Sequence, residues 1–94
     1  MRHAQSVLWR NASAVFFAVA FPCDSEEEFL AIVAAQRKAH HKAVHHCWAL
    51  RVRTTDGPLF EKSKDDGEVG HPGRVLLELL RRGDLEGGIV VSRV

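Results

Sequence analysis

The chain has 94 residues and a mass of 10.5 kDa, so we expect one domain over residues 1–94. Hydrophobic residues make up 46% of the chain and charged residues 27%, which excludes a disordered or collagen-like protein. The formal net charge of +1 excludes a protein that holds nucleic acid through a strongly positive overall field.

The cysteine content and the longest apolar run indicate where the protein works. Cys23 and Cys47 allow at most one disulfide, which is far below the density of small secreted domains. The apolar run over residues 12–21 ends at Pro22 and is too short to span a bilayer. We therefore expect reduced thiols, a cytoplasmic location and no membrane partner.

The N-terminal half predicts a strand, a helix and a second strand. Residues 13–21 alternate large and small side chains at period two, which is typical of a strand with one large-residue face. Ser25 and Glu28 form a capping box at the start of a helix over residues 26–40. Residues 44–53 return to period two and predict a strand with one apolar face.

The C-terminal half predicts a turn, a short strand, a loop, a helix and a last strand. Residues 54–58 have turn chemistry and lead into a short strand over residues 59–62. Residues 63–73 are rich in Lys, Asp, Gly and Pro and predict an exposed loop. We expect residues 65–74 to matter for partner binding but to contribute little to stability. Helical spacing returns over residues 75–82. Residues 89–94 predict a final strand with an open edge, through which we expect a homodimer.

Four histidines and one cysteine lie between residues 40 and 47, where a metal site is the first hypothesis to weigh. The helical period ends near His40 and the strand period begins four residues later, so the cluster is divided between two elements. On the strand, His45 and Cys47 share one face while His46 lies on the other. We therefore expect no native metal site and no cofactor.

A catalytic alternative uses Cys47 as a nucleophile with His45 nearby, because a thiolate needs a neighbouring base or positive charge. The carboxylates of Asp65 and Asp66 would complete a small Cys/His-dependent or metal-dependent hydrolase. The competing interpretations are a buried, unreactive cysteine and a solvated acidic turn that lacks the alternating pattern of a calcium loop. We favour these interpretations over the enzyme.

Several short stretches follow one another in a fixed order: Phe17-Ala-Val-Ala-Phe-Pro22, Ser25-Glu-Glu-Glu28, Ala43-Val-His-His-Cys-Trp-Ala49, Asp65-Asp-Gly-Glu68, Gly73-Arg74, Leu77-Glu-Leu-Leu80 and Val90-Val-Ser-Arg93. This order resembles the Impact N-terminal domain family over residues 13–94. Val69 stands where the family has a proline after Asp-Asp-Gly-Glu. We expect a single Impact N-terminal-like domain that ends at Val94, before the last strand and helix of the family domain.

The resemblance implies an α+β fold: a two-layer α/β sandwich similar to domain 2 of ribosomal protein S5, with a mixed or antiparallel sheet and two helices on one face. It also implies a protein without enzymatic activity. Eukaryotic members of the family act in translational control, so the resemblance implies a non-catalytic module that contacts the translation machinery through a protein partner.

The expected binding surface consists of His45, Cys47, Arg51, Asp65, Asp66, Gly67, Glu68, Gly73 and Arg74. RNA is the alternative partner, and an RNA-binding domain would use Arg51, Arg53, Arg74, Arg81 and Arg82. Such binding should weaken steeply with salt, because it depends on phosphate contacts.

Overall fold

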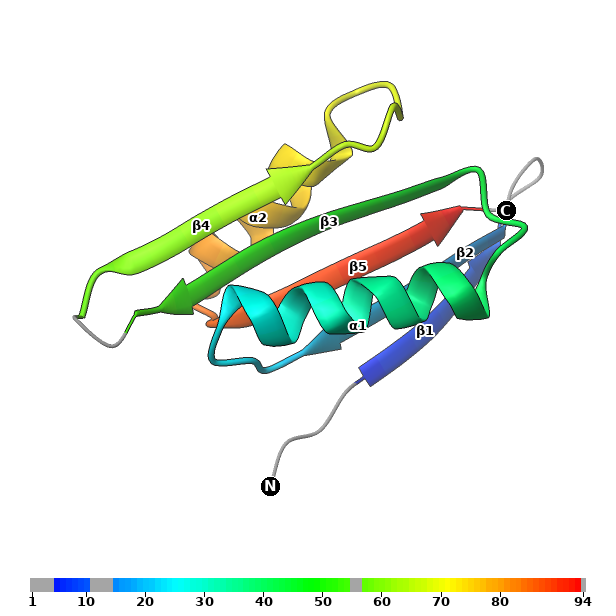
Figure 1. Cartoon of the computed structure of the whole chain (residues 1–94). Coiled ribbons are helices and arrows are strands. Elements are labelled where there is room, and N and C mark those ends of the chain that lie inside the picture. Colours follow the sequence, from blue (N-terminus) through cyan, green and yellow to red (C-terminus); the bar gives the residue numbers. More distant parts are fainter. Residues whose placement is uncertain (1–4, 11–14, 55–56, 94) are drawn as a thin grey trace.

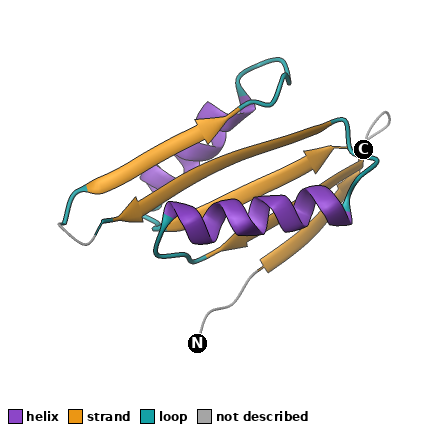
Figure 2. Cartoon of the chain, in the orientation of Figure 1, coloured by secondary structure: helices purple, strands orange, loops and turns teal. Residues whose placement is uncertain are grey.

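The chain forms one antiparallel sheet with two helices, and the computed structural model describes residues 5–10, 15–54 and 57–93. The elements are β1 (Gln5–Arg10), β2 (Val15–Phe21), α1 (Glu26–Ala39), β3 (His45–Arg53), β4 (Leu59–Lys64), α2 (Pro72–Arg82) and β5 (Gly87–Arg93). The strands lie in the order β1-β2-β5-β3-β4, and every neighbouring pair is antiparallel (Figures 1 and 2). The predicted α+β class with an antiparallel sheet is confirmed.

The two helices lie on opposite faces of this sheet, α1 in front and α2 behind in Figure 1. Trp48 and Leu50 of β3 belong to the same buried cluster as Phe29 of α1, whereas Ala49 between them packs with Leu77 of α2. Adjacent residues of a strand point to opposite faces, so α1 and α2 are separated by the sheet. The prediction of two helices on one face is wrong, because β3 is buried on both of its faces.

Helix α1 begins where its capping residues require. The Glu28 amide donates to Ser25 Oγ at 3.1 Å, and the Glu28 carboxylate accepts from the Asp24 amide at 3.2 Å. This reciprocal arrangement confirms the predicted capping box. Phe29 and Val33 then form the buried stripe of the helix, which packs against the front face of β3 and β5.

Strand β5 is central in the sheet. It pairs with β2 on one side and with β3 on the other, so its backbone groups are bonded on both sides. The predicted open edge at β5 is therefore wrong, whereas the homodimer stays a prediction. The edges of the described sheet are β1, which the sequence analysis did not predict, and β4.

The connection between β4 and α2 is shorter than predicted, because β4 extends to Lys64 and α2 begins at Pro72. Residues 65–71 therefore form this connection, which is named the acidic loop. The predicted strands over 13–21 and 89–94 and the turn over 54–58 each include residues outside the described part, namely 13–14, 94 and 55–56. Neither described helix is long and apolar enough to cross a membrane.

Candidate functional site

The acidic loop opens with a tight turn that its own sequence specifies. Asp66 and Gly67 have φ angles of 53° and 82°, and the Glu68 amide donates to the Asp65 carbonyl at 3.0 Å. Positive φ at both central residues is the requirement of a type I′ turn, which an Asp-Gly pair satisfies at low cost. The turn directs its three acidic side chains toward different neighbours.

Asp65 holds the start of α2. Its Oδ1 accepts from the Gly73 amide at 2.9 Å, and its Oδ2 lies 3.2 Å from His71 Nδ1. A helix N-terminus has unpaired amides, and a carboxylate satisfies one of them while opposing the positive end of the helix dipole. Gly73 is buried here, with no room for a side chain between α2 and the end of β4.

Asp66 connects the loop to the other face of the sheet. Its Oδ2 accepts from the His46 amide at 2.8 Å, and its Oδ1 accepts from Arg37 of α1 at 3.2 Å. Its backbone carbonyl accepts from His45 Nδ1 at 2.7 Å. Desolvation alone would raise the pKa of Asp66, but the His46 amide and the Arg37 guanidinium together hold that pKa below its usual value.

Glu68 forms an ion pair with Arg93 at the end of β5. Both carboxylate oxygens lie 2.8 Å from Arg93 Nη1, and this interaction lowers the pKa of Glu68 below its usual value. With Asp65 and Asp66, it fixes the loop at three points. The predicted solvated loop is therefore bonded to the rest of the fold at several points, and from these bonds we expect it to contribute to stability.

Cys47 lies beneath the loop and is only 5% exposed. Its Sγ donates to the Asp65 carbonyl at 3.3 Å. Burial, followed by the carboxylates of Glu68, Asp66 and Asp65, raises the pKa of the Cys47 thiol to about 11. At neutral pH the thiol is therefore protonated, which is the opposite of what a cysteine nucleophile needs.

We expect Cys23 and Cys47, both buried and neither in a disulfide, to react slowly with a thiol reagent such as DTNB in the native protein. Denaturation without a reductant should release two titratable thiols per chain. The measurement is the absorbance of the released thiolate at neutral pH, with and without guanidinium. Rapid labelling of Cys47 in the native state, located by mass spectrometry, would contradict the assignment of a buried and protonated thiol.

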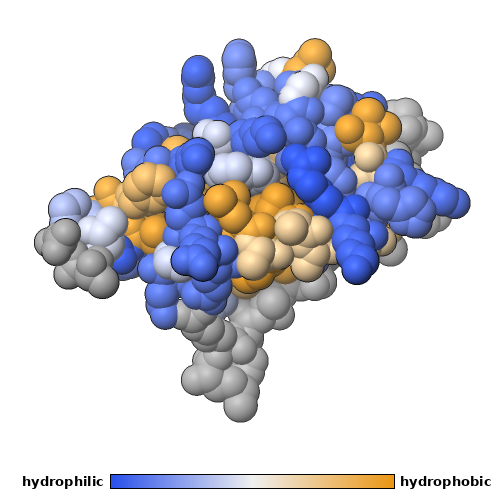
Figure 3. All heavy atoms as spheres, viewed as in Figure 1, coloured by the Kyte–Doolittle hydropathy of each residue, from blue (hydrophilic) through white to orange (hydrophobic). Residues whose placement is uncertain are grey.

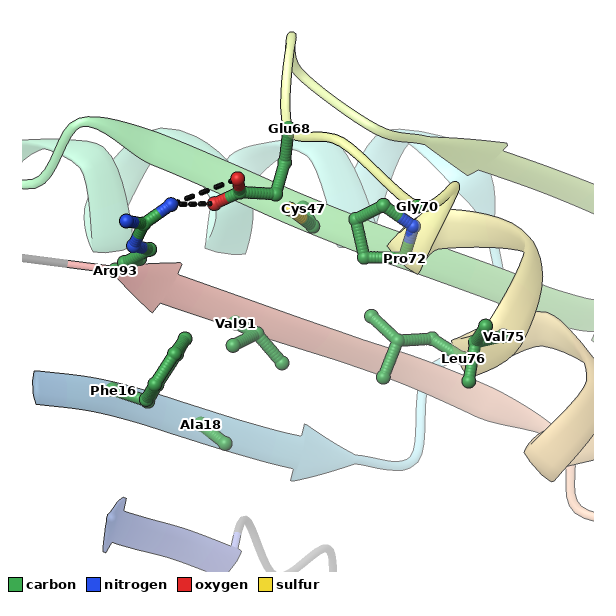
Figure 4. Close-up of a pocket in the computed structure, with 10 residues that line it drawn as sticks. All are labelled: Phe16, Ala18, Cys47, Glu68, Gly70, Pro72, Val75, Leu76, Val91 and Arg93. Carbon is green, nitrogen blue, oxygen red and sulfur yellow. Dashed lines mark hydrogen bonds and ion pairs between the residues drawn. The ribbon is translucent and has the colours of Figure 1, made fainter. Parts of the chain in front are cut away.

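An apolar pocket of about 610 Å³ opens beside the loop on the α2 face of the sheet (Figure 4). Ala18, Val91 and Cys47 form one row of its floor, because they are paired across β2, β5 and β3. The complete lining is Phe16, Ala18, Cys47, Glu68, Gly70, Pro72, Val75, Leu76, Val91 and Arg93. The Glu68–Arg93 ion pair borders the pocket, so its nearest charges are already matched.

The structure brings together most of the predicted site residues, and their partners connect them to the loop: His45, Cys47, Asp65, Asp66, Gly67, Glu68 and Gly73. Arg74 is exposed on the first turn of α2, and it forms no ion pair with the described residues. The sequence analysis missed Ala18, Val91 and Arg93. The signal that could have indicated a pocket was the presence of small residues on the face of β2 that points away from α1, because small side chains leave space above the sheet.

Arg51 lies apart from this site and holds the opposite end of the sheet together. It is 8% exposed, and its guanidinium donates to Glu61 and Asp84, each at 3.2 Å, and to the Leu85 carbonyl at 3.1 Å. The other arginines of the predicted RNA surface, except Arg74, are also matched by carboxylates: Arg53 by Glu86, Arg81 by Glu61 and Arg82 by Glu78.

The histidine cluster is divided in the way that the strand period predicts. His45 faces the acidic loop, whereas the His46 ring lies on the other face and its Nδ1 is 2.7 Å from Ser92 Oγ. Burial lowers the pKa of His46 below its usual value. Over residues 5–10, 15–54 and 57–93, no three His, Cys, Asp or Glu side chains are grouped as metal ligands.

Comparison with known proteins identifies the family. The model of the Impact N-terminal domain matches residues 12–94. The chain is 41% identical over 76 residues to a Thermus thermophilus protein described as an IMPACT family member in pol 5′region. That match covers 81% of this chain but 38% of the relative, so the chain spans well under half of the relative's length. No solved structure gives a significant match. The chain belongs to the Impact N-terminal domain family.

Proposed function

We propose that the chain is a non-catalytic, cytoplasmic module that binds a protein of the translation machinery through the apolar pocket beside the acidic loop. Membership of the Impact family supports the connection with translation. The pocket supports the mode of contact, because its floor and walls are aliphatic and aromatic side chains that water solvates poorly. The occupant would be a protein segment that presents apolar side chains.

The exposure of the pocket wall is the observation that carries this proposal. Val75 of α2 lines the pocket and is 55% exposed. Asp65 bonds the start of α2 and Glu68 pairs with Arg93, so the fold holds the pocket on both sides and the apolar surface is preformed. A preformed apolar surface binds without the cost of ordering a loop.

The polar groups around the pocket favour a binding role over a catalytic one. Glu68 is paired with Arg93, Asp65 with the start of α2, and the Cys47 thiol is protonated and donates to a backbone carbonyl. A general acid or base must reach a substrate proton, and a nucleophile must be activated. These groups are instead used to hold the loop in place.

The test is a substitution that places a charge in the pocket without disturbing the core. We expect Val75→Asp to abolish capture of a translation factor or ribosomal protein from cell extract, because an unpaired carboxylate would be desolvated in the contact. The captured proteins are identified by mass spectrometry. Leu30→Asp is the matched control, because Leu30 is 41% exposed on α1, on the other side of the sheet.

Both variants should keep the circular dichroism spectrum of the parent, since neither side chain is buried. Specific enrichment of one translation component by the parent and by Leu30→Asp, but not by Val75→Asp, is the expected result. Equal enrichment by both variants would remove the pocket from the proposal. Enrichment of no translation component by the parent would remove the translational role.

A further inference from the structure

The positive charge of the described residues is unevenly distributed, and a cluster of it that carboxylates only partly match lies where α1 ends. Arg37 and Lys64 share one carboxylate, that of Asp66, at 3.2 and 3.9 Å. Lys38 and Lys42 are exposed and form no ion pair with the described residues. Four cations and one carboxylate give these side chains a local charge of +3, whereas the whole chain carries +1.

The helix dipole explains only part of this cluster. Cations in the last turn of a helix offset its negative end, which accounts for Arg37 and Lys38. Lys42 lies three residues beyond the last helical residue, Ala39, and Lys64 lies on β4. Hydrophilic residues accordingly predominate over the end of α1 in Figure 3. This surface therefore has more positive charge than the fold requires.

A shallow apolar depression borders one of these cations, Lys42. It has a volume of about 370 Å³, and its lining includes Phe17 of β2 and His40, His41 and Lys42 at the end of α1. The rings of Phe17 and His40 are stacked, with centroids 4.3 Å apart and an angle of 23° between their planes. The ring pair beside the exposed Lys42, with Lys38 in the last turn of the same helix, combines the two features that hold a single nucleic-acid strand: a stacking platform and cations for the phosphates.

We propose that the end of α1 binds single-stranded RNA, with a base placed against the Phe17 and His40 rings and the backbone phosphates held by Lys38 and Lys42. This surface is separate from the apolar pocket, and it uses none of the arginines that the sequence analysis assigned to RNA. The module would then contact a protein on the α2 face and RNA on the α1 face.

The experiment measures the fluorescence anisotropy of a short labelled oligouridine over a range of salt concentrations. We expect the double variant Lys38→Gln with Lys42→Gln to weaken binding at low salt on the order of tenfold. Two lost phosphate contacts should reduce the slope of log affinity against log salt by about 1.4. The matched control is Arg74→Gln with Arg82→Gln, which removes the same net charge from α2 and should change affinity less than twofold.

A second measurement tests whether a base stacks on the Phe17 and His40 rings. An abasic strand of equal length should bind the parent protein more weakly than oligouridine, because it offers phosphates but no base. Equal losses in the two double variants would overturn the proposed location. Three outcomes would overturn the assignment of RNA as the ligand. The abasic strand could bind as tightly as oligouridine, polyglutamate could displace the labelled oligouridine as well as unlabelled oligouridine does, or the parent protein could fail to bind oligouridine at low salt. None of these results would bear on the apolar pocket.

Discussion

Replacing Gly73 by Ala should lower the free energy of unfolding by about 3 kcal/mol, which is a shift on the order of 10–20 °C in melting temperature. A methyl group at this position would lie 2.7 Å from the Lys64 carbonyl oxygen and 2.9 Å from Asp65 Oδ1. The first of these atoms is backbone, so a side-chain rotation cannot relieve the contact. Helix α2 would have to move away from β4, and the bond from the Gly73 amide to Asp65 would weaken.

The other end of the same helix provides the matched control. A methyl group on Gly83 would meet the side chain of Leu85 at 3.0 Å, and Leu85 is 56% exposed and free to rotate. The φ angle of Gly83 is −85°, which an alanine adopts without strain. Gly83→Ala should therefore change stability by less than about 1 kcal/mol. Urea denaturation followed by circular dichroism measures both variants, and equal losses would show that α2 is not held tightly against β4.

Replacing Asp66 by Ala should cost about 2–3 kcal/mol, although the sequence analysis expected little effect from this loop. The change leaves the partly buried His46 amide without its acceptor and removes the partner of Arg37. Alanine also tolerates the φ angle of 53° at this position less well than aspartate. Thermal denaturation at neutral pH gives the difference.

Asp66→Asn is the control for this second prediction, and it separates shape from charge. Asparagine accepts the positive φ angle and retains one oxygen for the His46 amide, so this variant should lose less than half as much stability as the alanine variant. Recovery of no stability by asparagine would show that the turn geometry contributes nothing.

The parent protein and Asp66→Asn should also differ in how their stability depends on pH in acid. Because the pKa of Asp66 is lower in the folded protein than the ordinary aspartate value of 3.8, the stability that this carboxylate adds is present above pH 3.8. That stability is lost as the pH falls through the folded pKa. The free energy of unfolding of the parent should thus fall more steeply below about pH 4 than that of Asp66→Asn. Parallel pH profiles would contradict the role assigned to the Asp66 carboxylate.

Local signals made most of the individual elements predictable. The capping residues Ser25 and Glu28 specify the start of α1, and the Asp-Gly pair specifies the turn of the acidic loop through backbone preferences alone. The period of β3 identified the face that packs on α1. Each of these signals involves residues only a few positions apart, so it can be recognised directly in the sequence.

The position of α2 could not be predicted in the same way. The back face of β3 presents Cys47, Ala49 and Arg51 and is buried, whereas the sequence analysis predicted only one apolar face for this strand. Arg51 is buried only because Glu61 and Asp84 reach it from other elements. Ion pairs between residues far apart in the sequence produce no periodic pattern in it. The burial of this face of β3 could therefore not be predicted from the sequence.

The candidate site shows the same limit. The motif Asp65-Asp-Gly-Glu68 was recognisable, but the residues that it binds are far away in sequence. Arg37 is 29 residues from Asp66, and Arg93 is 25 residues from Glu68. The pocket depends further on β5 lying between β2 and β3, which is a property of the sheet order. The position of the charged acidic loop beside an apolar pocket therefore depends on the tertiary fold and could not be predicted from the sequence.

The most direct test of the central claim is site-specific photo-crosslinking from the pocket wall. A photoreactive amino acid replaces Val75 in one protein and Leu30 in another, each is irradiated in cell extract, and the crosslinked partner is identified by mass spectrometry. We expect position 75 to crosslink to one protein of the translation machinery and position 30 to give no such product. Crosslinks to that protein from both positions, or from position 30 alone, would contradict the assignment of the apolar pocket as the binding surface.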